Sequence, residues 1–268
     1  EIYRCDWSSD VCSSDLSFIY ALLIMCSLFV NAQKFVGSLP LKFESKSNCF
    51  EIIDDEKKQL ALCINQAKKT QIIRLSPEFK VQDSMHMSRP DGDFKYLSGY
   101  SVQNGIYYLY WNSSGKEKSI GCQIYDFNTK KNSFVSIPFE LTKERVLAKI
   151  NKQGKFYVIS CIKGKSILNF RIFDGATVTQ KQLDLTEKSF LNYEGTRVSL
   201  SDLLSEETRL QPAFQVQKIS EEMPPSLVLG AKSRKVYVDG EDFIFTFDNY
   251  DAATQVFKIN TTDFNVKQ

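Results

Sequence analysis

Four stretches of the chain repeat one pattern of strands and turns, and this repeat constrains the fold more than any other feature of the sequence. Each stretch has an apolar segment rich in β-branched and aromatic residues, a polar turn, a second apolar segment with an amide residue near its start, and a shorter third segment. The stretches begin at Gln59, Ile106, Lys155 and Asp242. Their amide residues are Gln71, Gln123, Asn169 and Gln255.

A short apolar segment precedes each stretch and completes a unit of four antiparallel strands. These segments are Cys49–Ile53, Tyr96–Val102, Arg145–Ile150 and Lys235–Val238. The starts of the stretches are separated by 47, 49 and 87 residues, and the longest gap holds an insertion, residues 185–233. Within the insertion, LSDLLSEETRL predicts a short helix with Ser199 or Ser201 as its N-cap. An insertion that breaks a regular repeat is either part of a binding face or a decoration without function.

The chain resembles a β-propeller repeat protein over residues 40–268, because four strands in about 40 to 50 residues are the period of one blade. The resemblance is one of architecture, so it implies no catalytic residues. The alternative is a β-sandwich made of similar meanders. We expect an all-β domain over residues 33–268 that holds about four units and the insertion. No strand follows Phe264–Gln268 that could close a ring with the first unit, so we also expect the domain to be incomplete at its C-terminus.

Residues 1–16 are interpreted as an artefact. Cys5–Leu16 reads CDWSSDVCSSDL, and one choice of codons for these twelve residues gives the sequence of a widely used short-read sequencing adapter. We therefore exclude the segment from the fold and assign no chemistry to its cysteines and tryptophan.

Residues 17–32 are typical of a signal peptide. The apolar run Phe18–Val30 is followed by Asn31 and Ala32, a small-residue cleavage site. The run is shorter than the roughly 20 apolar residues of a membrane-spanning helix. This predicts an exported protein, periplasmic, at the cell surface or secreted, with no membrane span in the mature chain.

The charge of the chain favours neither nucleic acid nor any single strongly charged partner. The net charge is +2, and removing residues 1–16, which carry one basic and four acidic side chains, raises it to +5. These charges are scattered and form no basic stripe, so we expect a protein or glycan ligand and no nucleic acid.

Four cysteines remain after the first 32 residues: Cys49, Cys63, Cys122 and Cys161. They show no spacing typical of a zinc site. If Ile53 pairs with Gln59 across the first turn, then Cys49 faces Cys63. Export to an oxidising compartment would then favour a Cys49–Cys63 disulfide, and the alternative is two reduced thiols.

The sequence indicates no catalytic residues, no cofactor and no metal site. His86 is the only histidine, and it occurs in a polar linker with no nucleophile motif around it. The acidic segments at Asp91 and Asp93, and at Asp239, Glu241 and Asp242, have the chemistry of ordinary turns rather than of calcium loops.

The aromatic run from Tyr107 to Trp111 gives the candidate ligand contacts. Alternation places Tyr107, Leu109 and Trp111 on one face of a strand and Tyr108 and Tyr110 on the other. Tyr108, Tyr110 and Trp111 are candidates for stacking on a ligand, and the alternative is packing between blades. The function we expect is an exported binding or interaction module without catalysis. The alternative is the N-terminal propeller of a larger exported hydrolase.

Overall fold

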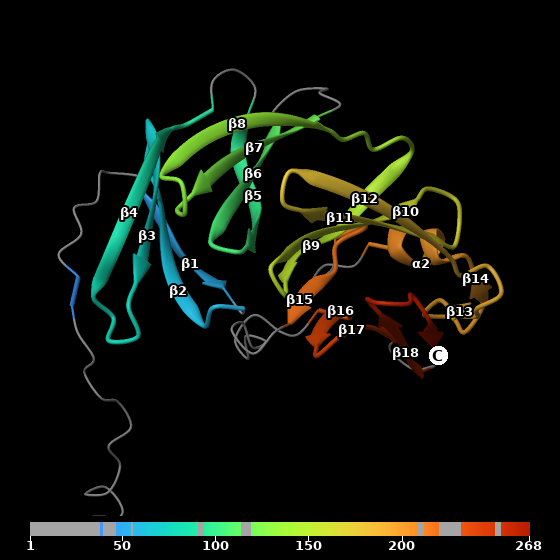
Figure 1. Ribbon diagram of the computed structural model, residues 1–268. Helices are drawn as coiled ribbons and strands as arrows, with labels where there is room; N and C mark the ends of the chain where they lie inside the picture. The colour runs from blue at the N-terminus through green and yellow to red at the C-terminus, as the bar shows by residue number, and fades with distance from the viewer. Residues whose placement is uncertain are drawn as a thin grey trace, which may run out of the picture. The chain divides into compact units, whose positions relative to one another are not determined.

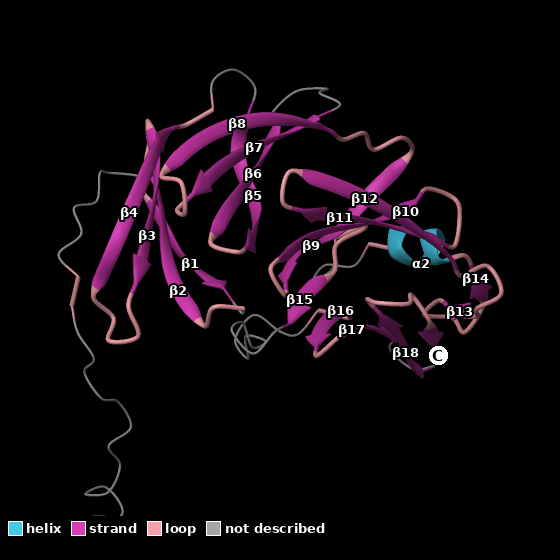
Figure 2. Cartoon of the chain, viewed as in Figure 1, coloured by secondary structure: helices cyan, strands magenta, loops and turns pink. Residues whose placement is uncertain are grey.

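A computed structural model describes residues 38–39, 47–54, 56–90, 94–113, 119–207, 212–219, 232–249 and 253–268. The chain divides into two compact units, residues 1–40 and 41–268, and all elements named below belong to the second unit. Nearly every regular element described there is a β-strand, and the strands form sheets that follow one another in chain order (Figures 1 and 2). The segments interpreted as adapter and signal peptide, residues 1–16 and 17–32, lie outside the described residues.

The first three sheets are antiparallel meanders of four consecutive strands each. The first contains β1 (Asn48–Asp54), β2 (Gln59–Asn65), β3 (Lys69–Leu75) and β4 (Val81–Ser88). The second contains β5 (Phe94–Gln103), β6 (Ile106–Ser113), β7 (Ser119–Asp126) and β8 (Lys131–Pro138). The third contains β9 (Glu144–Lys152), β10 (Lys155–Ile162), β11 (Ile167–Asp174) and β12 (Thr177–Asp184).

The fourth sheet has five strands, because the insertion adds one to the expected four. In order across the sheet they are β15 (Gln217–Ile219), β16 (Arg234–Asp239), β17 (Asp242–Asn249), β18 (Ala253–Asn260) and β19 (Val266–Lys267). The added strand β15 pairs with β16 in parallel, whereas the other pairs are antiparallel.

The insertion also contains the predicted helix. After the short pair β13 (Phe190–Leu191) and β14 (Arg197–Val198), helix α2 spans Leu200–Ser205. Its N-cap is Ser199, whose Oγ accepts the N–H of Asp202 at 3.1 Å. The leucines of the helix are buried in the core between the third and fourth sheets.

Three apolar cores join the sheets face to face. Between the first and second sheets the core includes Ile52, Ala61, Cys63, Ile72, Tyr107, Leu109 and Tyr125. Between the second and third it includes Tyr110, Ile120, Cys122, Phe156, Val158 and Phe173. Between the third and fourth it includes Ile159, Cys161, Phe170, Phe243, Phe245 and Phe257. Successive meanders stacked through their faces are propeller blades, and the four sheets form a propeller-like ring.

The repeat predicted from the sequence is confirmed in detail. The second strands β2, β6, β10 and β17 begin at the four residues where the repeated stretches were predicted to begin. Two-residue turns with positive φ precede β6 and β10. Asn104 and Gly105 (φ +50° and +80°) are the pair that such hairpins favour, and the second turn, Gln153 and Gly154 (φ +47° and +69°), also ends in glycine.

The predicted register of the first hairpin is wrong by one residue. Asp54 pairs with Gln59, so Phe50 faces Cys63 and Cys49 faces Ile64. The cause is the turn, which has four residues rather than five. The carboxylate of Asp54 accepts the N–H of Lys57 at 3.1 Å, and Lys58 adopts φ +50°.

Candidate ligand-binding cavity

Two of the three predicted stacking residues lie in the interior. Tyr110 and Trp111 are fully buried on β6, and Tyr108 is half-buried. The indole N–H of Trp111 donates to Oε1 of Gln123 at 2.9 Å, and the hydroxyl of Tyr110 donates to the carbonyl of Gly175 at 2.6 Å. Tyr110 therefore packs between the second and third sheets, Trp111 is buried with its indole bonded to its own sheet, and stacking on Tyr108 stays a prediction.

The one-residue register shift separates the two cysteines predicted to form a disulfide. Paired residues of neighbouring strands point to the same face, so Cys63 shares a face with Phe50, and Cys49 lies on the opposite face. Cys49 is exposed, Cys63 is buried, and both are free thiols. Burial raises the pKa of the Cys63 thiol far above its usual range.

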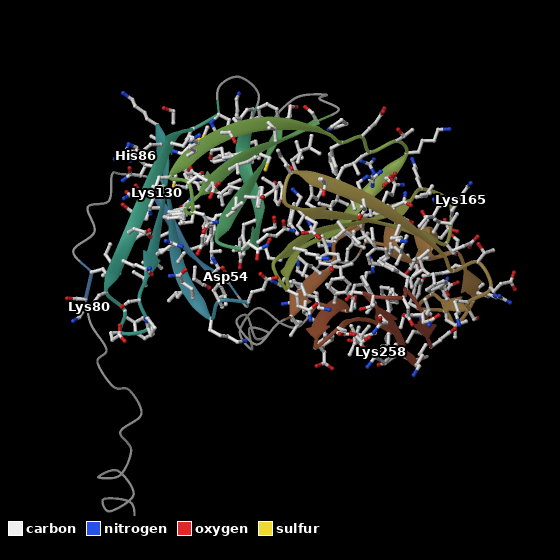
Figure 3. The ribbon with its side chains drawn as sticks, in the orientation of Figure 1. Asp54, Lys80, His86, Lys130, Lys165 and Lys258 are labelled. Atoms are coloured by element: carbon white, nitrogen blue, oxygen red, sulfur yellow. The ribbon has the colours of Figure 1, made fainter. Side chains whose placement is uncertain are left out.

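The other singled-out residues lie apart from one another. His86 is exposed on β4, which makes it a strand residue rather than a linker residue (Figure 3). Asp239 and Asp242 flank a tight turn at Gly240 (φ +48°), and Asp242 pairs with Lys258 at 2.6 Å, as expected of an ordinary hairpin. Asp91 and Asp93 lie outside the described residues.

Within the described part of the chain, no group of three or more His, Cys, Asp or Glu is placed to hold a metal ion. No helix of that part has the length and apolar character needed to cross a membrane.

A cavity of about 520 Å³ lies where the first strands of three successive sheets approach one another. Its walls come from the start of β1, the end of β2, the first part of β5, and Asn151 near the end of β9. The contacts between β1 and β5, and between β5 and β9, bring these segments together. The cavity is thus a product of the propeller arrangement and not of any single blade.

Two irregular pairings in β5 shape one wall of this cavity. The pairing of β5 with β6 skips a residue between Phe94 and Tyr96 and again between Leu97 and Gly99, which leaves Lys95 and Ser98 without partners in the ladder. Bulges of this kind redirect side chains and are frequent beside functional sites. Both bulged residues line the cavity.

Gly99 allows the second and third sheets to approach closely behind the cavity wall. A Cβ at this position would lie 2.2 Å from the ring of Phe156 on β10, so a larger residue does not fit without a shift. Beside it, the backbone N–H of Tyr100 donates to Oδ1 of Asn151 at 3.0 Å, which fixes that amide in the wall.

Aromatic rings and amides provide the uncharged part of the lining. The rings of Phe50 and Tyr100 stack with centroids 6.2 Å apart, and Tyr96 is 64% exposed. Four amide side chains also line the cavity: Asn48, Asn65, Gln66 and Asn151. Among the described residues, nothing donates a hydrogen bond to the buried Oδ1 of Asn65.

The charges at the cavity are mostly positive. Among the described residues, Arg89 and Lys95 line it together with one carboxylate, Glu51. The guanidinium of Arg89 lies 5.1 Å from the centroid of the Trp111 ring and donates to the carbonyl of Lys95 at 2.7 Å. Lys149, two residues before Asn151 on β9, donates from Nζ to Oγ of Ser98 at 3.1 Å. Its side chain reaches solvent, yet the surrounding strands partly desolvate the ammonium and lower its pKa.

A second groove, of about 570 Å³, lies at the turns of the first sheet. It is lined by residues 57–60, 74–77, 79 and 82, all from that one sheet. Phe79 is 44% exposed there, and the side chains of Gln59 and Gln82 bond to each other at 2.6 Å. Because its polar groups already pair with one another, we regard this groove as the weaker candidate.

The sequence interpretation missed the cavity, although one signal for it was present. Gly99 lies inside a predicted strand, and a glycine inside a strand indicates a bulge or a close backbone approach. The remaining lining residues belong to three different repeats, and their meeting depends on how the sheets stack.

Comparisons with known proteins add no family. No family model matches the chain, and no curated protein matches it. Among solved structures, an apocarotenoid oxygenase of Synechocystis is similar at a TM-score of 0.39 and 7% identity, over 87% of this chain and 52% of that chain. The fucose-specific lectin of Aleuria aurantia gives 0.34 and 13%, over 87% and 65%. A puromycin-hydrolyzing peptidase of Mycobacterium tuberculosis gives 0.32 and 10%, over 81% and 28%. The chain thus spans about half the length of the oxygenases that it matches, and similarity at this level carries no argument about function.

Proposed function

We propose that this chain is the ligand-binding propeller of an exported protein and that the cavity between β1, β5 and β9 binds a saccharide. The observation that carries the proposal is the lining of the cavity. It combines an exposed aromatic ring, Tyr96, with four amide side chains and a buried acceptor, Oδ1 of Asn65. Export rests on the apolar run before Ala32.

The chemistry of a sugar ring fits these groups. Its C–H faces pack on an aromatic ring, and its hydroxyls both donate and accept hydrogen bonds, as amide side chains do. Small-molecule sites have volumes of about 300–1,000 Å³ and a few converging polar groups, and a cavity of about 520 Å³ falls in this range. If the chain is instead the N-terminal propeller of a larger exported hydrolase, the same saccharide would bind in the same cavity.

Isothermal titration against a panel of oligosaccharides tests the proposal. The panel contains cellotetraose, maltotetraose, lactose, sialyllactose and tetragalacturonate. We expect at least one to bind, and we expect Tyr96→Ala to weaken that binding about fivefold to tenfold, because a stacking surface is lost.

Tyr193→Ala is the matched control, because Tyr193 is 61% exposed and lies away from the cavity. It should bind as the unmodified protein does. The proposal fails if the folded protein binds no member of the panel, or if the Tyr96 and Tyr193 variants bind equally well. A protein ligand would then be the better interpretation.

A further inference from the structure

Three cations lie at or beside the cavity without an acidic partner among the described ion pairs: Arg89, Lys95 and Lys149. Elsewhere Lys130, Lys155, Lys235 and Lys258 each form an ion pair with an aspartate. None of the ion pairs between described residues involves Arg89, Lys95 or Lys149. Among the described residues, Arg89 and Lys95 line the cavity, Lys149 contacts Ser98 of its wall, and Glu51 is the one carboxylate in the lining.

Arg89 and Lys149 are each held near the wall by contacts with neutral groups. The contacts of Arg89 with the Trp111 ring and the carbonyl of Lys95 hold its guanidinium without neutralising it. Lys95 sits in the first bulge of β5, and Ser98 in the second bulge accepts from Lys149. The bulges therefore place two residues at the same cavity. Lys95 carries one ammonium group, and Ser98 orients the ammonium group of Lys149.

We infer that the saccharide bound in this cavity is acidic and that Lys95 and Lys149 bind its carboxylate. This inference rests on the function proposed above and adds the charge of the ligand. A carboxylate accepts hydrogen bonds from ammonium groups at shorter distances and with greater strength than a neutral hydroxyl does. Partial desolvation of Lys149 strengthens such a contact, because charges attract more strongly where water is excluded. The Ser98 hydroxyl, already in contact with Lys149, is available to donate its own proton to the same carboxylate.

Paired ligands that differ only in charge test the inference. Titrations compare tetragalacturonate with its fully methyl-esterified form, and sialyllactose with its methyl ester and with lactose. We expect an acid form to bind, and we expect esterification to weaken binding about tenfold to a hundredfold, because a charge-assisted contact is lost. Raising the salt concentration should weaken binding of the acid and leave binding of the ester unchanged.

Variants then connect the charge to its residues. Lys95→Ala combined with Lys149→Ala should reduce the affinity for the acid to that for its ester. Lys181→Ala is the matched control, since Lys181 is exposed on β12 outside the cavity lining, and it should leave the affinity unchanged.

The outcomes separate the inference from the function that it rests on. If neutral sugars or esters bind as tightly as acids, the inference is overturned and the saccharide site stands. If an acid binds but the double lysine variant does not weaken it, the inference is overturned as well. If the folded protein binds nothing in either panel, the proposed function fails and the inference fails with it.

Discussion

At the scale of single residues, buried polar side chains connect the blades to the chain segments between them. Nε2 of Gln123 donates to the carbonyl of Ser88 at the end of the first sheet, at 2.6 Å. Gln255 both donates to and accepts from the backbone of Leu191, at 2.9 and 2.8 Å, and so holds the insertion against the fourth sheet. The amide that the sequence repeats in each unit therefore has a structural use in these two sheets.

A buried charge contact in the third sheet joins Glu144 and Arg171. The guanidinium bonds to both carboxylate oxygens, at 2.6 and 2.8 Å, and Ser160 donates to the same carboxylate at 2.5 Å. Both side chains are less than one-tenth exposed. Burial alone would raise the pKa of Glu144, but the bonds from Arg171 and Ser160 outweigh it and lower the pKa.

We predict that this pair makes the protein sensitive to acid. Because the pKa of Glu144 is lower in the folded state, its contribution is complete above the pKa of about 4.3 that a glutamate has in the unfolded chain, and it is lost as pH falls through the folded value. Glu144→Gln should lower the free energy of unfolding at pH 7 by about 3 kcal/mol or more, because Arg171 stays buried without its partner.

Urea unfolding at pH 7 and at pH 3 measures this effect. The difference between variant and unmodified protein should be smaller at the lower pH, because the contribution of Glu144 declines as the pH falls below about 4.3 towards its lowered folded pKa. Asp83, whose pKa is also lowered by Arg74, titrates in the same window in both proteins and cancels from the difference. A difference that is the same at both pH values would contradict the assignment.

At the scale of elements, strand β5 combines a structural and a candidate functional task. Its bulges place Lys95 and Ser98 at the cavity, and Gly99 lets the ring of Phe156 pack directly on its backbone. We predict that Gly99→Ala destabilises the protein by about 1–3 kcal/mol, because the new methyl group overlaps that ring.

Thermal unfolding of Gly99→Ala, with Phe156→Leu as a second change, tests this explanation. The smaller side chain at position 156 should make the glycine substitution less costly than it is in the unmodified protein. Equal costs in the two backgrounds would show that the Phe156 contact is not the reason for the glycine.

The register of the hairpin β1–β2 gives a prediction about thiols. Cys49 is exposed, whereas burial raises the pKa of Cys63, and it raises the pKa values of Cys122 and Cys161 to about 12. Alkylation of the native protein followed by peptide mapping should label Cys49 and leave the other three until the protein unfolds. Recovery of a disulfide-linked peptide pair containing Cys49 and Cys63 would contradict the register, because these residues lie on opposite faces of the sheet.

At the scale of the whole molecule, the sequence predicts the blades better than it predicts what lies between them. Strand starts such as Gln59 and Ile106 depend on local turn chemistry and alternation, so they are predicted to the residue. The first hairpin register depends on a turn length that composition does not determine, and it is off by one. Burial of Tyr110 depends on the neighbouring third sheet.

The cavity is predicted least well, for the same physical reason. Glu51, Ser98 and Asn151 follow one another in sequence at intervals of about 50 residues and come from three repeats. Only the stacking of the sheets brings them together. A binding site of this kind is a property of the ring and not of a motif.

The central claim is that the cavity between β1, β5 and β9 is the ligand site. Hydrogen–deuterium exchange with and without the tightest-binding oligosaccharide of the panel tests it most directly. Peptides that cover residues 48–51, 95–100 and 149–151 should exchange more slowly in the presence of the ligand. Protection confined to residues 57–60 and 77–82, the groove of the first sheet, would contradict the claim and move the site to a single blade.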